Sequence, residues 1–162
     1  MSGSAWWRGQ RGEWYVVAQF VLFVLVAIGP TTWHGWPGWA FPDSRLTSVA
    51  AGVLLIGGAS LAIAGARKHG SRLTALPYPA EGAAALATGP YRVVRHPIYC
   101  GASFVAFGWA LMLQGWLTLA YAALLFLLFD AKARREERWL VETFPSYADY
   151  QRRVRKFVPF VY

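Results

Sequence analysis

Residues 88–101 read T-G-P-Y-R-V-V-R-H-P-I-Y-C-G and separate two long apolar segments of the chain. The stretch holds two arginines three residues apart, a histidine, two tyrosines and the backbone breakers Gly89, Pro90 and Pro97. Ionisable side chains at the edge of an apolar segment are costly unless they pair or carry a function. The stretch therefore predicts a functional site at the mouth of a membrane helix.

The composition is typical of a membrane protein. Hydrophobic residues make up 56% of the 162 residues, above the roughly 45–50% that is usual for soluble domains. A net charge of +8 raises nucleic-acid binding as an alternative, but basic residues beside apolar spans mark a cytoplasmic face and no RNA-binding signature occurs. The single cysteine, Cys100, excludes an internal disulfide and a cysteine-based metal cluster, and we expect no metal site.

Four apolar segments predict an all-α, polytopic membrane helix bundle in a single domain covering residues 1–162. The expected spans are 14–30, 47–66, 97–113 and 116–130, each close to the length that crosses a bilayer. Gly29-Pro30 ends the first span, and Gln114-Gly115 makes a tight turn between the last two. The third and fourth spans are therefore expected to form a helical hairpin.

The last helix is expected to continue beyond its apolar part, because no breaker occurs before Pro145. At about 100° per residue, Phe129, Ala133 and Leu140 fall on one apolar stripe. Glu137 lies inside that stripe and Glu136 lies at its edge. A carboxylate in such a position needs a cationic partner or a bound ligand.

The distribution of basic residues predicts the orientation in the membrane. Fifteen of the sixteen Lys and Arg residues lie in the amino-terminal tail, in the 67–97 region or after residue 130. Four spans place these three regions on one side, so the positive-inside rule predicts that both termini are cytoplasmic. The same topology brings the 88–101 stretch and the helix with Glu137 to one face, where we expect a site.

Taken in order, these motifs resemble the isoprenylcysteine carboxyl methyltransferase family. The resemblance rests on G-P-Y-R at 89–92, R-H-P-I-Y at 95–99, Gly101, an apolar hairpin, Glu136-Glu137, F-P-S-Y-A-D-Y at 144–150, and R-V at 153–154. It covers about residues 65–162. Phospholipid N-methyltransferases, thiol methyltransferases and, more distantly, sterol reductases are related to this family. One departure is Phe144-Pro145, where the family usually has Phe-Gly.

The resemblance implies a membrane methyltransferase that uses S-adenosylmethionine without a Rossmann fold, and no G-x-G-x-x-G between a strand and a helix is seen. The cofactor carries a sulfonium, a carboxylate and an ammonium, so its pocket needs acidic groups, hydrogen-bond donors and an apolar cleft. Of the acidic pair, Glu137 is favoured for the direct contact because of its place in the stripe. The cofactor-binding residues implied by the family motifs are Tyr91, His96, Pro97, Tyr99, Gly101, Glu136, Glu137, Tyr147 and Tyr150.

Arg95 and Arg153 match arginines that the family places near the methyl acceptor, and they are the predicted catalytic residues. A carboxylate acceptor is already anionic at neutral pH, so the arginines would orient it and no base is needed. An amine acceptor would require a glutamate or a tyrosine as base. The expected reaction is methyl transfer to a lipophilic acceptor, most like isoprenylcysteine carboxyl O-methylation. Phospholipid N-methylation and thiol S-methylation are the alternatives.

Simpler interpretations stand beside this one. Arg92 and Arg95 could anchor a loop to anionic headgroups. Glu136 and Glu137 could form a solvated salt-bridge face with Lys132, Arg134 and Arg138. A reductase on the same scaffold or a non-catalytic membrane protein are the other functional classes. The compact chain looks like a microbial relative, so we expect an inner-membrane protein in contact with membrane lipids and a lipophilic substrate, whose oligomeric state the sequence leaves open.

Overall fold

The computed structural model describes residues 12–34, 36–39, 44–69, 88–158 and 162, and all structural statements refer to these residues. They form five α-helices: α1 (Glu13–Ile28), α2 (Ser44–His69), α3 (Pro97–Leu113), α4 (Trp116–Thr143) and α5 (Tyr147–Arg153). A short 3-10 helix, η3 (Gly89–Arg92), precedes α3. No strand occurs in the described ranges, which confirms the all-α fold class. The amino-terminal tail to residue 11 and the 70–87 region, whose charges support the predicted orientation, lie outside these ranges.

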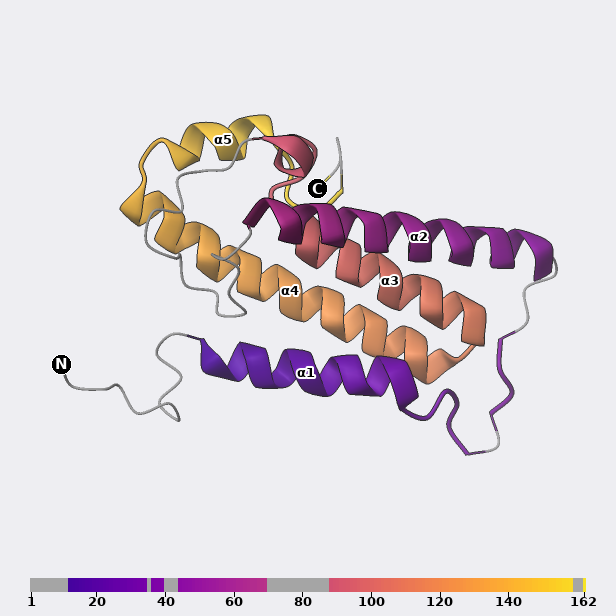
Figure 1. Cartoon of the computed structure of the whole chain (residues 1–162). Helices are drawn as coiled ribbons and strands as arrows, with labels where there is room; N and C mark the ends of the chain where they lie inside the picture. Colours follow the sequence, from indigo (N-terminus) through magenta and orange to yellow (C-terminus); the bar gives the residue numbers. More distant parts are fainter. Residues whose placement is uncertain (1–11, 35, 40–43, 70–87, 159–161) are drawn as a thin grey trace.

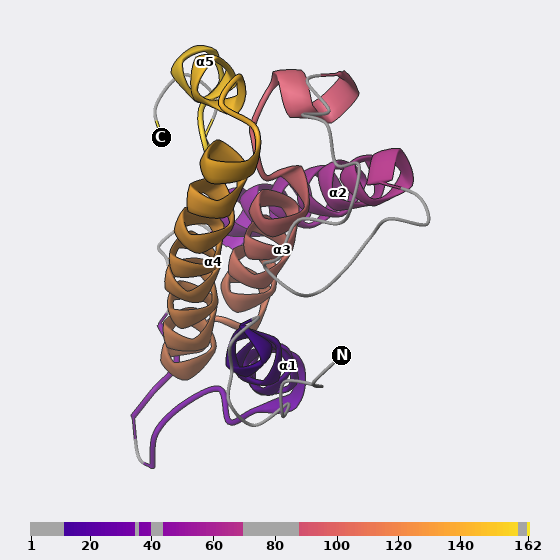
Figure 2. The same ribbon diagram turned by 90° about the vertical axis from the view of Figure 1, so that its left-hand side faces the viewer.

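The four long helices run alternately in opposite directions (Figure 1). α2 packs along α3, α3 packs against α4, and α4 packs against α1. The end of α2, the start of α3 and the end of α4 therefore meet at one end of the bundle, where α5 and η3 lie together (Figures 1 and 2). This arrangement brings the 88–101 stretch and the charged part of α4 to the same place, as the sequence predicted.

The predicted spans are helices, and their bounds differ in instructive ways. The 14–30 segment ends as a helix at Ile28, where the Gly29 N–H bonds to the Leu25 carbonyl and Pro30 follows. α2 extends beyond the predicted 47–66 at both ends, because polar residues such as Arg45 and Lys68 end an apolar run without ending a helix. α4 continues through its charged half to Thr143. Two helices, α2 and α4, are long and apolar enough to cross a membrane, whereas α1 and α3 are shorter apolar helices.

A glycine pair sets the close approach of α2 and α3. A Cβ atom placed on Gly58 would lie 2.6 Å from the Gly101 carbonyl oxygen, and one on Gly101 would lie 2.4 Å from the Gly58 carbonyl oxygen. Both clashes are with backbone, which cannot move without separating the helices. Small residues allow such contacts between helices. The contact fixes the start of α3, and with it the 95–99 motif, against α2.

Replacing Gly58 by alanine is expected to destabilise the protein by about 1–3 kcal/mol, because the added methyl group overpacks the contact with α3. The matched control is Gly57→Ala in the same helix, where an added Cβ meets nothing within 4 Å. Thermal unfolding in detergent should show a lower midpoint for Gly58→Ala than for Gly57→Ala. Equal midpoints would contradict the close contact.

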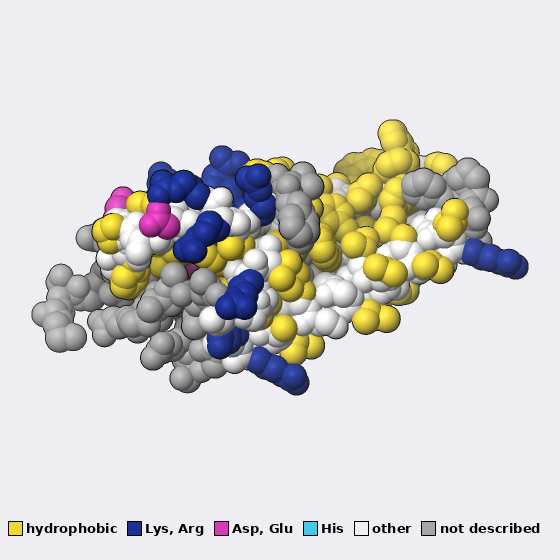
Figure 3. Space-filling view, turned by 90° about the horizontal axis from the view of Figure 1, so that it is seen from above, with side chains coloured by type: hydrophobic (Ala, Val, Ile, Leu, Met, Phe, Trp, Pro, Cys, Tyr) yellow, Lys and Arg dark blue, Asp and Glu magenta, His cyan; other side chains and the backbone are white. Residues whose placement is uncertain are grey.

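Charge is concentrated at the end of the bundle that carries η3 and α5. Figure 3 shows Lys and Arg side chains gathered over this end and hydrophobic side chains spread over much of the remaining surface. Exposed apolar side chains are frequent along α2, where they include Leu46, Val49, Val53, Ile56 and Ile63. The molecule thus has a polar end and an apolar body.

Candidate functional site

The 94–96 segment is held in place by the chain that follows α5. Val94 and Arg155 form an isolated parallel bridge. The backbone N–H of Arg95 donates to the Arg155 carbonyl at 2.8 Å, and that of His96 donates to the Lys156 carbonyl at 3.2 Å. Two neighbouring side chains of the motif are thereby fixed by a segment some sixty residues away.

The same carboxy-terminal segment is anchored to α4 by a second polar contact. The Lys156 ammonium lies 2.8 Å from one carboxylate oxygen of Asp130. The Tyr162 hydroxyl donates to the same oxygen at 2.8 Å. Arg134 pairs with the other oxygen of Asp130 at 2.7 Å. α4, the 155–157 segment and the 94–96 segment are therefore tied to one another.

Glu137 is the centre of the site, and we call Arg95, His96, Glu137 and Gln151 the Glu137 cluster. Its Oε1 accepts a hydrogen bond from Arg95 Nε at 2.7 Å and is hydrogen-bonded to His96 Nε2 at 2.9 Å. Its Oε2 accepts from Gln151 Nε2 at 3.1 Å and from a terminal nitrogen of Arg95 at 3.3 Å. A carboxylate has about four lone-pair positions, so these four bonds occupy the acceptor capacity of Glu137.

The charge of Glu137 is stabilised by its partners. Residue 137 lies beyond the apolar half of α4, level with the start of α1, since Arg135 stacks over the Tyr15 ring. Burial alone would raise the pKa of Glu137, but the hydrogen bonds from His96 and Arg95 outweigh it and lower the pKa to about 2. Glu137 is therefore a carboxylate at neutral pH, paired from within the protein. The alternative of a solvated salt-bridge face does not hold for this buried residue.

Arg95 has few donors left for a ligand. Besides its two bonds to Glu137, its other terminal nitrogen donates to the backbone carbonyls of Gln151, at 3.0 Å, and Val154. Four of the five guanidinium N–H groups are thus engaged, and the side chain is 11% exposed. Arg95 connects the motif to α4 and to the end of α5.

Glu136 differs from its neighbour because it keeps acceptor capacity. Its Oε2 accepts a hydrogen bond from the Tyr99 hydroxyl at 3.1 Å and lies 4.0 Å from His96 Nδ1. Within the described part of the chain, its Oε1 has no hydrogen-bond partner. The Glu136 side chain is 25% exposed, compared with 8% for Glu137. Glu136 is therefore the more exposed carboxylate of the pair and the one with acceptor capacity left for a ligand.

Stacked aromatic rings hold this region in shape. The His96 ring stacks on the Tyr99 ring with centroids 5.4 Å apart and an interplanar angle of 4°. Tyr99 stacks in turn on Phe129 of α4 at 4.8 Å and 6°. Phe157 packs against the His96 ring from another side, at 5.9 Å. The imidazole cannot turn over without breaking these contacts.

Three further tyrosines close the site and remain protonated at neutral pH. The Tyr150 hydroxyl donates to the Tyr91 carbonyl, which ties α5 to η3. Burial raises the pKa of Tyr150 to about 12 although Arg95 opposes the shift. Burial and the nearby carboxylates raise the pKa values of Tyr91 and Tyr147 further, with Glu136 acting on both. These phenols can donate hydrogen bonds, but none of them can serve as a base.

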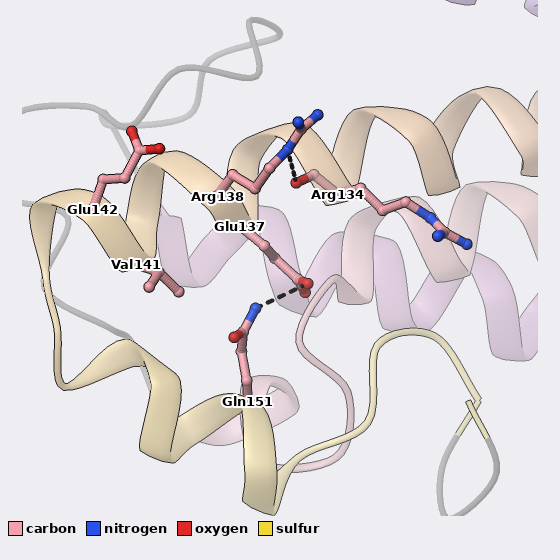
Figure 4. A pocket seen from close by; sticks show the side chains of 6 residues that line it. All are labelled: Arg134, Glu137, Arg138, Val141, Glu142 and Gln151. Atoms are coloured by element: carbon pink, nitrogen blue, oxygen red, sulfur yellow. Dashed lines mark hydrogen bonds between the residues drawn. The ribbon is translucent and has the colours of Figure 1, made fainter.

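A cavity of about 510 Å³ opens on the outer side of the Glu137 cluster. Figure 4 shows Glu137 and Gln151 directed toward each other across it, with Arg138 and Glu142 directed away from them. The lining residues are Arg134, Glu137, Arg138, Val141, Glu142 and Gln151. The cavity makes one side of the cluster accessible from the polar end of the molecule.

A buried lysine connects the site to α1. Lys132 is 1% exposed, and its ammonium donates to the Gln19 side-chain oxygen at 2.7 Å. The same ammonium lies 5.0 Å from the centroid of the Tyr99 ring, within the range of a cation–π contact. Phe23 of α1 also packs against Phe129. α1 therefore supports the far side of the ring stack.

The predicted site residues separate into two groups. Tyr91, His96, Tyr99, Glu136, Glu137, Tyr147 and Tyr150 converge with Arg95 at the polar end of the bundle. Pro97 is the buried first residue of α3. Gly101 lies in the contact with α2, and Arg153 is exposed, with its Nε bonded to the Asp149 carbonyl at 3.3 Å. Their proposed contacts with cofactor or acceptor stay predictions.

Sequence reasoning missed two participants. Gln151 donates to Glu137 and gives its carbonyl to Arg95, yet nothing in its neighbourhood distinguishes it from a surface glutamine. Gln19 left a signal, since it is the one polar side chain that interrupts the apolar run 16–28. Its partner Lys132, four residues before Glu136, entered the sequence analysis only in the alternative of a solvated salt-bridge face.

Comparison with known proteins adds the family. A profile described as phospholipid methyltransferase matches residues 46–146, well over half of the chain. The chain belongs to the phospholipid methyltransferase family. The match covers α2, η3, α3 and α4, and so contains the 88–101 motif and both Glu136 and Glu137. Membership of this family confirms the resemblance on which the sequence analysis relied.

Two relatives are named as metal resistance proteins. The chain is 34% identical over 157 residues to the cobalt-zinc-cadmium resistance protein CzcN of Cupriavidus metallidurans, and 31% identical over 158 residues to the nickel-cobalt-cadmium resistance protein NccN of Alcaligenes xylosoxydans xylosoxydans. Each match covers 94% of the present chain. The chain spans 64% and 65% of the length of the two relatives.

Proposed function

We propose that this protein transfers a methyl group from S-adenosylmethionine to a lipophilic acceptor at the membrane interface. The observation that carries the proposal is the convergence, at one polar end of an apolar bundle, of the 95–99 motif with Glu136 and Glu137. This convergence lies within the part of the chain that matches the phospholipid methyltransferase family. A chain that only anchored headgroups would not need two carboxylates enclosed by its basic motif.

The residues present fit the cofactor. When bound, S-adenosylmethionine supplies a methyl group made electrophilic by its sulfonium. The available oxygen of Glu136 suits an ammonium or the sulfonium, and tyrosine faces suit a cation or the adenine ring. The protonated phenol of Tyr147 provides a hydrogen-bond donor. In this assignment Glu136, rather than Glu137, makes the direct contact, because the acceptor positions of Glu137 are occupied.

The two predicted catalytic arginines take different roles in this proposal. Arg95 maintains the architecture of the site, since four of its donors are used within the protein. Arg153 is exposed at the end of α5 and is available to orient an anionic acceptor or its headgroup. If the acceptor carries a proton that must be removed, the site offers Glu136 as the base. The tyrosines stay protonated at neutral pH and cannot take this role.

Membrane placement follows from the apolar body. We propose that α1 and α3 cross the membrane together with α2 and α4, and that both termini and the Glu137 cluster lie on the cytoplasmic side. α1 and α3 have 16 and 17 residues, about 24–26 Å at ~1.5 Å per residue. Local thinning of the bilayer accommodates spans of this length at modest cost. Exposed apolar side chains along α2 support contact with lipid.

The acceptor is to be identified by product mass spectrometry. Protein in detergent or nanodiscs is incubated with methyl-labelled S-adenosylmethionine and, separately, a prenylcysteine, a phosphatidylethanolamine and a lipophilic thiol. O-methylation of the prenylcysteine is the reaction that the sequence resemblance favours, with N- and S-methylation as alternatives. Label in none of the products, together with no binding of the cofactor, would refute a methyltransferase function.

The metals in the relatives' names do not change this assignment. Within the described residues, no group of three or more His, Cys, Asp or Glu side chains gathers as metal ligands would. The site is instead a carboxylate cluster paired with basic and aromatic side chains.

A further inference from the structure

Two carboxylates flank the His96 ring, and they are not equivalent. Nε2 lies 2.9 Å from Glu137 Oε1, which is hydrogen-bond distance, whereas Nδ1 lies 4.0 Å from Glu136 Oε2, which is too long for a direct bond. The ring is held between Tyr99 and Phe157. The two ring nitrogens therefore face different environments, and the packed ring cannot rotate to interchange them.

We propose that Glu137 is a positioning residue that holds His96 in the Nε2-protonated tautomer, so that an unprotonated Nδ1 faces Glu136 and accepts a hydrogen bond from a ligand. The proposal rests on the proposed function, because the ligand it invokes is the cofactor. It removes Glu137 from the direct contacts that the sequence suggested and gives it an indirect role.

The assignment of the tautomer follows from hydrogen-bond chemistry. An ionised carboxylate only accepts hydrogen bonds, and Glu137 is kept ionised by Arg95 and its other donors. The proton between Glu137 and His96 must therefore belong to the imidazole. The hydrogen bond made by one ring nitrogen decides the state of the other, so that when the ring carries a single proton, this proton is on Nε2 and Nδ1 is an acceptor.

The arrangement also defines the chemical group that fits beside His96. Nδ1 and Glu136 Oε2 are two acceptors 4.0 Å apart. A group with two or more N–H donors can satisfy both, as a primary ammonium does. The Tyr99 hydroxyl, which donates to the same Glu136 oxygen, keeps that carboxylate in place. We expect the α-ammonium of the cofactor to bind here.

Nuclear magnetic resonance of the imidazole nitrogens tests the tautomer directly. The chain has only three histidines, His34, His69 and His96. Protein labelled with ¹⁵N-histidine, carrying an affinity tag without histidine, should give three ring systems in detergent, and His96→Asn assigns the third. The expected wild-type pattern is a protonated Nε2 and an unprotonated Nδ1. A protonated Nδ1, with or without a proton on Nε2, would overturn the proposal without any variant.

Variants then test the role of Glu137. Glu137→Gln should abolish the single-tautomer pattern and weaken binding of S-adenosylhomocysteine by about tenfold or more, because a charged hydrogen-bond acceptor is lost. Glu142→Gln removes an exposed carboxylate on the same helix and should change neither. An unchanged tautomer in Glu137→Gln, or an equal effect of Glu142→Gln, would contradict the positioning role. If Glu137→Gln does not fold, the protonation of the His96 nitrogens in the wild-type protein still decides whether the proposed tautomer is present.

Two ligands separate this proposal from the proposed function. S-adenosylhomocysteine carries the ammonium, whereas methylthioadenosine retains the nucleoside and a thioether without it. Only the first should shift the His96 Nδ1 resonance. Binding of S-adenosylhomocysteine without a shift at Nδ1 would overturn the ammonium contact while leaving the methyltransferase proposal standing. No binding of either ligand would instead count against the proposed function.

Discussion

Replacing Glu136 by glutamine is expected to weaken the binding of S-adenosylhomocysteine by roughly 10- to 100-fold. Among the described residues, one oxygen of this carboxylate has no hydrogen-bond partner, and the carboxylate lies beside His96 Nδ1, so it is the group available to a cationic ligand. A hydrogen bond to a charged group contributes about 1.5–3 kcal/mol, which corresponds to that range of affinity. Isothermal titration calorimetry in detergent measures the loss.

The control for this prediction is Glu142→Gln, which removes a carboxylate six residues further along α4. Its affinity should equal that of the wild-type protein. Because Glu136 is partly exposed, its substitution should leave the unfolding midpoint nearly unchanged, so a loss of affinity cannot be ascribed to unfolding. Wild-type affinity in Glu136→Gln would show that the cofactor binds elsewhere.

Arg95→Met is expected to produce the largest loss of stability, about 3–5 kcal/mol, because it leaves the buried Glu137 carboxylate without its main cationic partner. It also removes the donors to the carbonyls of Gln151 and Val154 and so releases the end of α5. Denaturant or thermal unfolding in detergent measures the effect. Arg153→Met, at an exposed position, should stay within about 0.5 kcal/mol of the wild-type protein.

A double-mutant cycle tests the explanation. If the penalty comes from an unpaired buried charge, then Arg95→Met combined with Glu137→Leu should be more stable than Arg95→Met alone. The recovery should be incomplete, because His96 and Gln151 lose their acceptor in the double variant. Additive losses from the two substitutions would contradict the direct pairing of Arg95 with Glu137.

Much of the fold could be predicted from the sequence, because the apolar periodicity and the breakers were strong. The turn at Gln114-Gly115 and the uninterrupted helix through residues 116–143 both appear as expected. Helix bounds were less accurate where polarity changed before the helix ended, as at both ends of α2. Apolar runs mark where a helix is surrounded by lipid or protein, whereas helix ends depend on backbone hydrogen bonds.

The sequence predicted which residues gather at the site but not which hydrogen bonds join them. The place of Glu137 in an apolar stripe indicated a cationic partner, and the structure supplies Arg95. The sequence could not show that four donors would use all of its acceptor capacity, since Gln151 reaches it only through the fold of α5. Nor could it show that the 155–157 segment would pair with residues 94–96. This pairing directs the side chains of Arg95 and His96 toward Glu137.

The glycine of the motif illustrates a second limit. Gly101 was expected beside the cofactor because the family motif includes it. In the structure its missing side chain lets Gly58 of α2 approach, which is a packing role that a motif cannot reveal. A residue can be required in a site motif because it fixes the helix that carries part of the site, and α3 begins within the 95–99 motif.

The most direct test of the central claim is the binding of radiolabelled S-adenosylmethionine to the purified protein by equilibrium dialysis. We predict saturable binding of one molecule per chain, competed by S-adenosylhomocysteine and strongly reduced in Glu136→Gln but not in Glu142→Gln. The absence of saturable binding by folded wild-type protein in both detergent and nanodiscs would contradict the assignment of this site to a methyltransferase.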